Sequence, residues 1–230
     1  MKGIGIGESD FRGLITRDNY YIDKTMYIKD IIDNQSRVIL ITRPRRFGKT
    51  LNMSMLRYYF DCRQKDSKEL FKGLKIMSQE EKYTSKLGYY PVIYLTLKDV
   101  SENTYENMLL SLKTAILNMY KEHIYLLDSN KIYGFEKEKI ENVLYERENE
   151  NEIKTAIREL SEYLNRYYEK PVILLIDEYD VPIQSAYVEG YYEEAINFLK
   201  AFYRITFKDN PWLEKTVLTG VSRVAKESIF

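Results

Sequence analysis

Four short apolar segments alternate along this chain with longer segments in which apolar residues recur every three or four positions. The apolar segments have the length of β-strands and cover 38–42, 91–97, 171–176 and 215–221. The helical periodicity predicts helices over about 25–34, 50–60, 103–127, 153–164 and 190–207. Strands that alternate with helices predict an α/β fold, in which a parallel, doubly wound sheet forms the middle layer of a three-layer sandwich.

The remaining segments show weaker patterns. Residues 1–19 contain spaced glycines, but no strand precedes them, so we expect an extended glycine-rich segment and no dinucleotide fingerprint. Residues 61–90 are charged and predict short helices and loops. The acidic run 146–152 predicts a solvated connection between helices.

The first predicted strand runs directly into a basic turn and then into a helix. This stretch consists of Arg43, Pro44, Arg45, Arg46, Phe47, Gly48, Lys49, Thr50 and Leu51. A strand that ends in Gly-Lys-Thr at a helix N-terminus is typical of a phosphate-binding P-loop, whose backbone N–H groups surround the phosphates. In such a loop Lys49 reaches the outer phosphates and the Thr50 hydroxyl binds Mg²⁺.

One position departs from the P-loop pattern G-x-x-x-x-G-K-[ST], because Arg43 stands where the pattern has its first glycine. Glycine tolerates backbone conformations that most side chains disfavour, so the arginine weakens the bare motif. The preceding strand and the following helix strengthen it. We therefore expect a phosphate site, with a plain structural turn as the alternative.

The third predicted strand, 171–176, ends in the acidic sequence Asp177-Glu178-Tyr179-Asp180. In a P-loop protein an aspartate at the tip of a buried strand holds the Mg²⁺ shell, and a glutamate after it orients and deprotonates the attacking water. We assign these roles to Asp177 and Glu178. The alternative is an exposed acidic loop, but ligands of parallel sheets gather at the carboxyl ends of the strands, where both motifs lie.

Further polar residues follow the fourth predicted strand. Thr219 and Arg223 are candidates for sensing the γ-phosphate, and Arg223 is a candidate for stabilising its charge; a surface loop is the alternative. The arginines of the basic turn have three alternatives: they bind phosphate, pair with Asp177 and Asp180, or contact nucleic acid.

Composition excludes several other classes of protein. The 230 residues suit one α/β domain, and 35 basic residues balance 35 acidic ones, so contact with nucleic acid would need a local patch. Cys62 is the single cysteine, which excludes an internal disulfide, and His123 is the single histidine, in a predicted helix without a nucleophile nearby. No apolar run is long enough to cross a membrane and no signal peptide is visible, so we expect a soluble cytoplasmic protein.

Four segments together resemble the AAA-ATPase-like family of prokaryotic P-loop proteins, namely 21–25, 43–51, 175–180 and 218–220. The resemblance covers nearly the whole chain in the same order, and an arginine at position 43 is the expected variant in that family. It implies an ASCE-type, AAA-like P-loop NTPase core with Asp177 and Glu178 as the Walker B pair, and ATP as the nucleotide.

The resemblance also sets an expectation for the end of the chain. Members of the family continue into further helices and often into a PD-(D/E)XK nuclease-like domain, whereas this sequence ends after the fourth strand. We expect one domain, with an N-terminal segment and helix (1–36) and a core (37–230), that is incomplete at its C-terminus and lacks a lid. A homo-oligomer or a partner domain would then supply the missing elements.

The sequence thus predicts a domain that binds ATP·Mg²⁺ and hydrolyses it to drive a conformational switch or motor. The cofactor-binding residues are 43–51 and Thr219, the metal ligands are Thr50 and Asp177, and the catalytic residues are Glu178, Lys49 and Arg223. Two alternatives remain. One is a nucleotide sensor without turnover, and the other is a nucleic-acid-binding protein that uses Arg43–Arg46.

Overall fold

The computed structural model describes residues 3, 5, 7–17 and 19–223. Within this part of the chain, four strands form one sheet in the order β1-β4-β3-β2, and every neighbouring pair is parallel. The strands are β1 (Val38–Thr42), β2 (Val92–Thr96), β3 (Val172–Asp177) and β4 (Leu213–Gly220). All four predicted strands are therefore confirmed.

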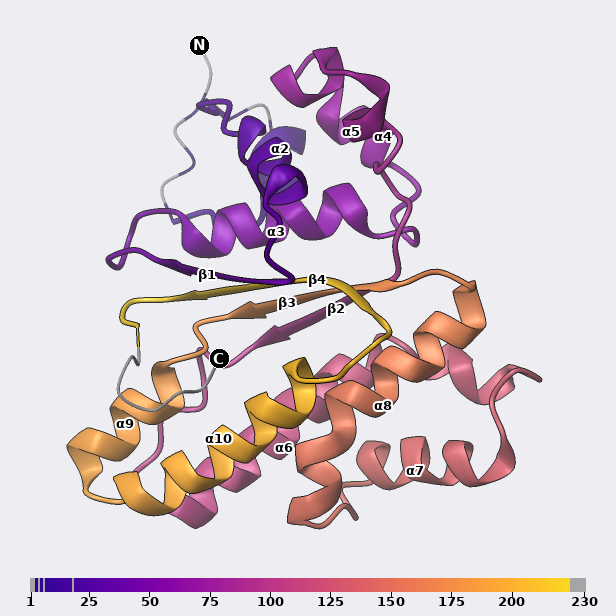
Figure 1. Ribbon diagram of the computed structural model, residues 1–230. Helices are drawn as coiled ribbons and strands as arrows, with labels where there is room; N and C mark the ends of the chain where they lie inside the picture. The colour runs from indigo at the N-terminus through magenta and orange to yellow at the C-terminus, as the bar shows by residue number, and fades with distance from the viewer. Residues whose placement is uncertain (1–2, 4, 6, 18, 224–230) are drawn as a thin grey trace.

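Helices cover both faces of the sheet, which confirms the predicted three-layer α/β sandwich (Figure 1). One layer contains α1 (Phe11–Thr16), α2 (Met26–Asp33), α3 (Lys49–Phe60), α4 (Ser67–Phe71), α5 (Glu81–Thr84) and the 3₁₀-helix η1 (Lys75–Ser78). The other contains α6 (Tyr105–Lys121), α7 (Gly134–Leu144), α8 (Glu150–Tyr168), α9 (Val181–Glu189), α10 (Tyr192–Phe207) and the 3₁₀-helix η2 (Ile124–Asp128).

Strand β3 packs against both helical layers. Leu174 and Ile176 belong to the hydrophobic cluster beneath the sheet, whereas Ile173 and Leu175 belong to the cluster around α3. Every residue of β3 is buried. This two-sided burial explains why the strand is an unbroken apolar run, because neither of its faces meets water.

The parallel register brings the carboxyl ends of three strands to one edge of the sheet. Thr42 of β1 is paired with Gly220 of β4, and Leu218 of β4 is paired with Ile176 of β3. The helix after β1 crosses one face of the sheet, while the helices after β2 and β3 cross the other (Figure 1). Connections that diverge in this way leave a crevice at the carboxyl ends of the strands, where ligands bind in open α/β sheets.

The N-terminal segment differs from the expected extended conformation, because residues Phe11–Thr16 form α1. The Asp10 side chain caps this helix by accepting a hydrogen bond from the Gly13 backbone N–H at 2.8 Å. Phe11 and Leu14 are buried in the layer around α3. The helix is too short for its periodicity to stand out in the sequence, and burial against α3 stabilises it.

The predicted helix 103–127 is shorter in the structure and is followed by a 3₁₀ turn. Helix α6 ends at Lys121, and η2 begins at Ile124. The carbonyl oxygen of Glu122 accepts a hydrogen bond from the Arg63 guanidinium at 2.8 Å, in place of a helical amide. This contact joins residues far apart in the sequence, so the local pattern does not reveal where the helix ends.

The acidic run 146–152 is in part the solvated connection that we expected, because it begins between α7 and α8 and most of its residues are exposed. Its last residues begin α8, where Asn149 and Glu152 form a capping box, and Glu148 is buried with only 2% of its surface exposed. Helix α9 was not predicted; it has Pro182 in its first turn, ends at Glu189 and has Gly190 as its C-cap. None of the helices in the described ranges has the length and hydrophobicity needed to span a membrane.

Glu148 generates a prediction on stability and pH. Neither of its carboxylate oxygens has a hydrogen-bond partner among the described residues. Burial raises the pKa of Glu148 above its ordinary value; the charges of Glu146 and Glu152 add to this effect, and the residue's own backbone N–H and Lys113 oppose it. The folded protein therefore keeps the Glu148 proton at pH values where the unfolded chain has lost it, so this group destabilises the fold as the pH rises through that window.

We expect Glu148→Gln to raise the free energy of unfolding at neutral pH by about 1 kcal/mol, because a neutral amide loses less on burial than a carboxylate. The gain should shrink toward about pH 4, where both side chains are neutral. Urea unfolding across this pH range measures the effect. The matched control is Glu138→Gln at an exposed position, and equal effects of the two substitutions at every pH would contradict the prediction.

Candidate functional site

The basic turn between β1 and α3 has the backbone of a tight loop. Arg46 and Gly48 both adopt left-handed conformations, with φ of 69° and 73°. Gly48 occupies the N-cap of α3, where a Cβ atom would be strained by this φ. Glycine adopts this conformation without strain, whereas Arg46 adopts a similar φ at a cost.

Arg43 explains why the first glycine of the P-loop pattern is dispensable here. Its backbone is not among the described residues with a positive φ, so a side chain fits without strain. Its N–H donates a hydrogen bond to the Gly220 carbonyl at 3.1 Å, which fastens the start of the loop to the end of β4.

Lys49 and Glu178 meet in the structure although 128 residues separate them in the sequence. The Lys49 side chain is only 4% exposed, and its Nζ lies 3.4 Å from Oε1 of Glu178. The same Nζ donates to the backbone carbonyls of Arg43 at 3.2 Å and Pro44 at 3.4 Å. The basic and acidic motifs thus form one site.

Asp177 and Glu178 face different surroundings. Asp177 is the last residue of β3 and is buried, and its Oδ1 accepts a hydrogen bond from the Thr219 hydroxyl at the end of β4. Glu178 has a φ of 55°, and its side chain lies beside Lys49 with 21% exposed. The alternative of an exposed acidic loop is therefore wrong, because Asp177 and Asp180 are both buried.

A cleft of about 540 Å³ lies in front of Lys49 and Glu178. Its lining residues are Gly7, Glu8, Ser9, Arg46, Gly48, Lys49, Thr50, Leu51 and Glu178. The wall formed by residues 7–9 was missed in the sequence. The available signal was Asp10, a helix N-cap residue, followed by Phe11 and Leu14 on one helical face.

The other predicted site residues, Asp177 among them, are not part of the lining of this cleft. Arg43, Pro44, Arg45 and Phe47 are exposed, and Phe47 keeps 62% of its surface in solvent. Thr219 is buried at the end of β4. Within the described ranges, no salt bridge joins Arg43, Arg45 or Arg46 to Asp177 or Asp180, so the pairing considered for these arginines is not formed.

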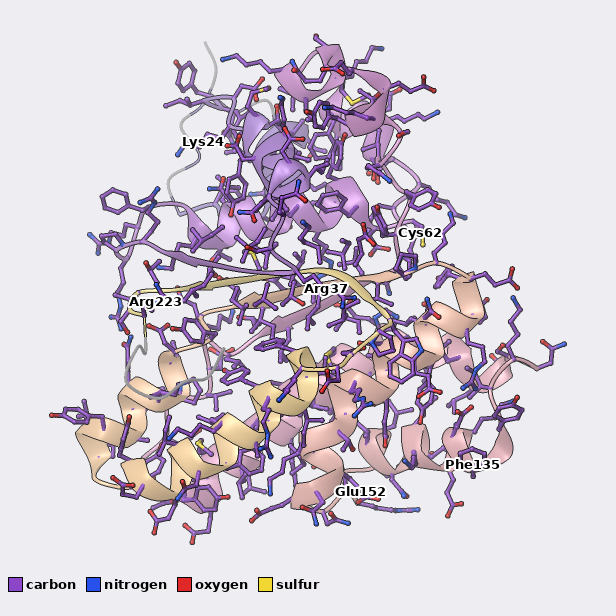
Figure 2. The ribbon with its side chains drawn as sticks, viewed as in Figure 1. Lys24, Arg37, Cys62, Phe135, Glu152 and Arg223 are labelled. Atoms are coloured by element: carbon purple, nitrogen blue, oxygen red, sulfur yellow. The ribbon has the colours of Figure 1, made fainter. Side chains whose placement is uncertain are left out.

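Arg223 lies apart from the cleft. Together with Val38, Leu40 and Thr42 it lines a separate cavity of about 310 Å³ beside β1. Figure 2 shows Arg223 near the carboxyl ends of the strands, with Arg37 nearer the opposite end of the sheet. The structure therefore places Arg223 at the expected edge of the sheet but in a neighbouring cavity.

The residues present fit a magnesium ion by their chemistry. Thr50 offers a hydroxyl in the first turn of α3 and Asp177 offers a carboxylate, and Mg²⁺ prefers such hard oxygen ligands. The structure shows no group of three or more His, Cys, Asp or Glu side chains able to hold a metal, as far as it is described. Mg²⁺ is commonly held by one or two carboxylates together with water and substrate phosphates.

Comparison with protein families identifies one match over nearly the whole chain. A family model described as "Predicted AAA-ATPase" matches residues 4–230, which confirms the resemblance drawn from the sequence motifs. Its description supports nucleotide binding by an ATPase-like protein. Comparisons with curated proteins and with solved structures returned no match.

Gly220 generates a prediction on the integrity of the site. A Cβ atom at this position would lie 2.5 Å from Oδ1 of Asp180 and 2.7 Å from Cε1 of Tyr179, and both neighbours are fully buried. We expect Gly220→Ala to lower the free energy of unfolding by about 1–3 kcal/mol, because packed neighbours must shift to admit the methyl group. Urea denaturation measures the change.

Gly134→Ala is the matched control, because a Cβ atom at Gly134 meets open space at the start of α7. The control should leave stability unchanged or raise it slightly. Equal stability of the two variants would show that Gly220 is not closely packed.

Proposed function

The chain belongs to the predicted AAA-ATPase family, and on this premise we propose that it binds ATP with Mg²⁺ and hydrolyses it. In this proposal the cleft beside Lys49 receives the phosphates, and turnover drives a conformational switch or motor. The activity is that of an acid anhydride hydrolase.

The observation that carries the proposal is the contact between the two motifs. Nζ of Lys49 and Oε1 of Glu178 lie 3.4 Å apart, and both residues line the same cleft as Thr50. A cation for phosphate oxygens and a carboxylate for a water molecule are two of the groups that catalyse phosphoryl transfer to water.

The proposal gives roles to the P-loop and to Glu178, which line the cleft, and to the buried Asp177 at the end of β3. The backbone of the loop up to Gly48 and the N-terminus of α3 bind the phosphates, since free N–H groups and the helix dipole both favour anions. Thr50 and Asp177 hold Mg²⁺, which neutralises charge on the phosphates when bound. Glu178 orients a water molecule and accepts its proton.

Binding of ATP would change the partner of Lys49. Its ammonium group is nearly buried and is now satisfied by Glu178 and by two backbone carbonyls. Phosphate oxygens carry more charge than carbonyl oxygens and compete for this ammonium group. Glu178 would then be released from Lys49 and become available to water.

The same contact supports a second candidate function. A carboxylate engaged by Lys49 cannot accept a proton from water as readily as a released one, so a site that keeps this pair would bind nucleotide without turnover. The chain would then act as a nucleotide sensor that passes a signal to a partner.

Lys49→Ala tests the binding site. We expect ATP affinity to fall about tenfold to a hundredfold, which corresponds to the loss of charged hydrogen bonds worth about 1.5–3 kcal/mol. Calorimetric titration with ATP and Mg²⁺ measures this. Lys72→Ala, in which a largely exposed lysine (78% of its side chain) is removed, should bind like the wild type, and unchanged affinity of Lys49→Ala would refute the site.

Glu178→Gln distinguishes the two candidate functions. In an enzyme the substitution should lower the rate of phosphate release about 10²–10⁴-fold, the usual contribution of a general base, while ATP still binds. The control is Glu69→Gln, whose side chain is 78% exposed. Wild-type protein that binds ATP but releases no phosphate would favour the sensor.

A further inference from the structure

The two residues after the acidic pair, Tyr179 and Asp180, are completely buried, at 0% exposed each. A buried carboxylate is strongly destabilising unless donors compensate its charge. The donors to Asp180 come from the segment that follows β4. Its Oδ2 accepts hydrogen bonds from the backbone N–H of Val221 at 3.0 Å, from the backbone N–H of Ser222 at 2.8 Å and from the Ser222 hydroxyl at 3.0 Å.

A side chain of α9 completes the shell of this carboxylate. Nε2 of Gln184 donates to Oδ2 of Asp180 at 2.6 Å and also lies 3.3 Å from the Ser222 hydroxyl. Four donors therefore converge on one oxygen atom.

Tyr179 binds the same segment at two further points. Its backbone N–H donates to the Thr219 carbonyl at 2.9 Å, and its hydroxyl donates to the Ser222 carbonyl at 2.8 Å. The Tyr203 hydroxyl of α10 in turn donates to the Tyr179 carbonyl at 2.7 Å. Burial raises the pKa of Tyr203 well above its ordinary value, so this phenol keeps the proton that it donates.

Residues 219–222 are thus held from both sides. The acidic motif binds them through Tyr179 and Asp180, while the Arg43 N–H at the start of the P-loop donates to the Gly220 carbonyl at 3.1 Å. The first residue of the segment, Thr219, donates its hydroxyl to Asp177. The absence of a side chain at Gly220 lets Tyr179 and Asp180 approach the segment this closely.

We propose that Tyr179 and Asp180 are positioning residues for ATP hydrolysis. Together with residues 219–222 they form what we call the strand-end latch, which keeps Thr219 on the Asp177 carboxylate and fixes the backbone on either side of Glu178. This inference rests on the proposed function of the cleft. It adds that the orientation of the acidic pair depends on the loop after β4.

The backbone conformation of Glu178 links the strand-end latch to the orientation of the Glu178 carboxylate. Glu178 adopts a left-handed backbone, with φ of 55°, between Asp177 in the sheet and the buried Tyr179. Its carbonyl accepts a hydrogen bond from the Val181 N–H at 3.2 Å. With both neighbours anchored, the left-handed turn is retained and the Glu178 side chain points to Lys49.

Asp180→Asn is the central test, because it keeps the size of the side chain but removes the charge that four donors share. ATP affinity should stay within about threefold, since Lys49 and the P-loop backbone are unchanged. The kcat for phosphate release should fall about tenfold to a hundredfold, the effect expected from losing hydrogen bonds to a charged group. Asp128→Asn, at an exposed position, is the matched control and should keep the wild-type kcat.

Hydrogen–deuterium exchange of residues 219–222 supplies a second readout that needs no turnover. Asp180→Asn should accelerate exchange in this segment, because the Val221 and Ser222 amides would donate to a neutral amide oxygen in place of a charged carboxylate, and should leave exchange in β1 unchanged. A double-mutant cycle with Ser222→Ala tests the direct link, and the two substitutions should be non-additive in kcat. Tyr179→Phe, compared with Tyr145→Phe at an exposed tyrosine, replaces Asp180→Asn if the latter does not fold.

The outcomes separate the latch from the proposed function. If wild-type protein neither binds nor hydrolyses ATP, the proposed function fails and with it the role of the latch in catalysis, whatever the exchange data show. If wild-type protein hydrolyses ATP and Asp180→Asn keeps its kcat, the latch proposal is overturned while the proposed function stands. A loss of ATP affinity equal to the loss of kcat would also overturn it, because that pattern indicates general damage to the site.

Discussion

The site depends on the parallel hydrogen bonding of β1, β4 and β3. Strand β4 lies between the strand of the P-loop and the strand of the acidic motif, with Thr42 paired to Gly220 and Ile176 paired to Leu218. Parallel strands bring their carboxyl ends to one edge, so the basic turn, the acidic motif and the segment after β4 must meet there. The contact between Lys49 and Glu178 follows from this register.

The site buries charge, and each buried charge is compensated in a different way. Lys49 has backbone carbonyls and one carboxylate around its ammonium group. Asp180 has no cation beside it in the described structure and relies on two backbone amides, a hydroxyl and an amide side chain. A cation held partly by neutral carbonyls can exchange them for phosphate, whereas a carboxylate saturated by amides of its own chain is better suited to a structural role.

The architecture and the two motifs could be predicted from the sequence. All four strands were predictable, because buried parallel strands are apolar throughout and their pattern is local. Lys49, Thr50, Asp177 and Glu178 were found because their positions at strand ends follow from that pattern. The end of α6 was not predictable, since it depends on a hydrogen bond from Arg63. Nor was the burial of Asp180, because three of its four donors belong to Val221 and Ser222, more than forty residues away.

The role of Tyr179 could not be inferred from its residue type either. A tyrosine between acidic residues gives no local sign of whether it faces solvent or a core, and only the packing of β4 and α10 decides this. The same holds for residues 7–9, which reach the cleft because α1 packs on α3 through Phe11. Contacts of this kind depend on tertiary structure and produce no periodic spacing of apolar residues in the sequence.

Backbone strain separates Glu178 from other residues with similar dihedral angles. Glu146, Glu169 and Asp209 also have a positive φ, but they are exposed, where turns and helix ends accommodate such conformations without further support. Glu178 is instead followed by two fully buried residues and preceded by the last residue of a buried strand. A left-handed conformation of this kind costs about 1–3 kcal/mol and persists only where the surroundings impose it. The hydrogen bonds of Tyr179 and Asp180 are such surroundings. The strain at Glu178 and the burial of its two neighbours therefore have one explanation, because both keep the Glu178 carboxylate in its position beside Lys49.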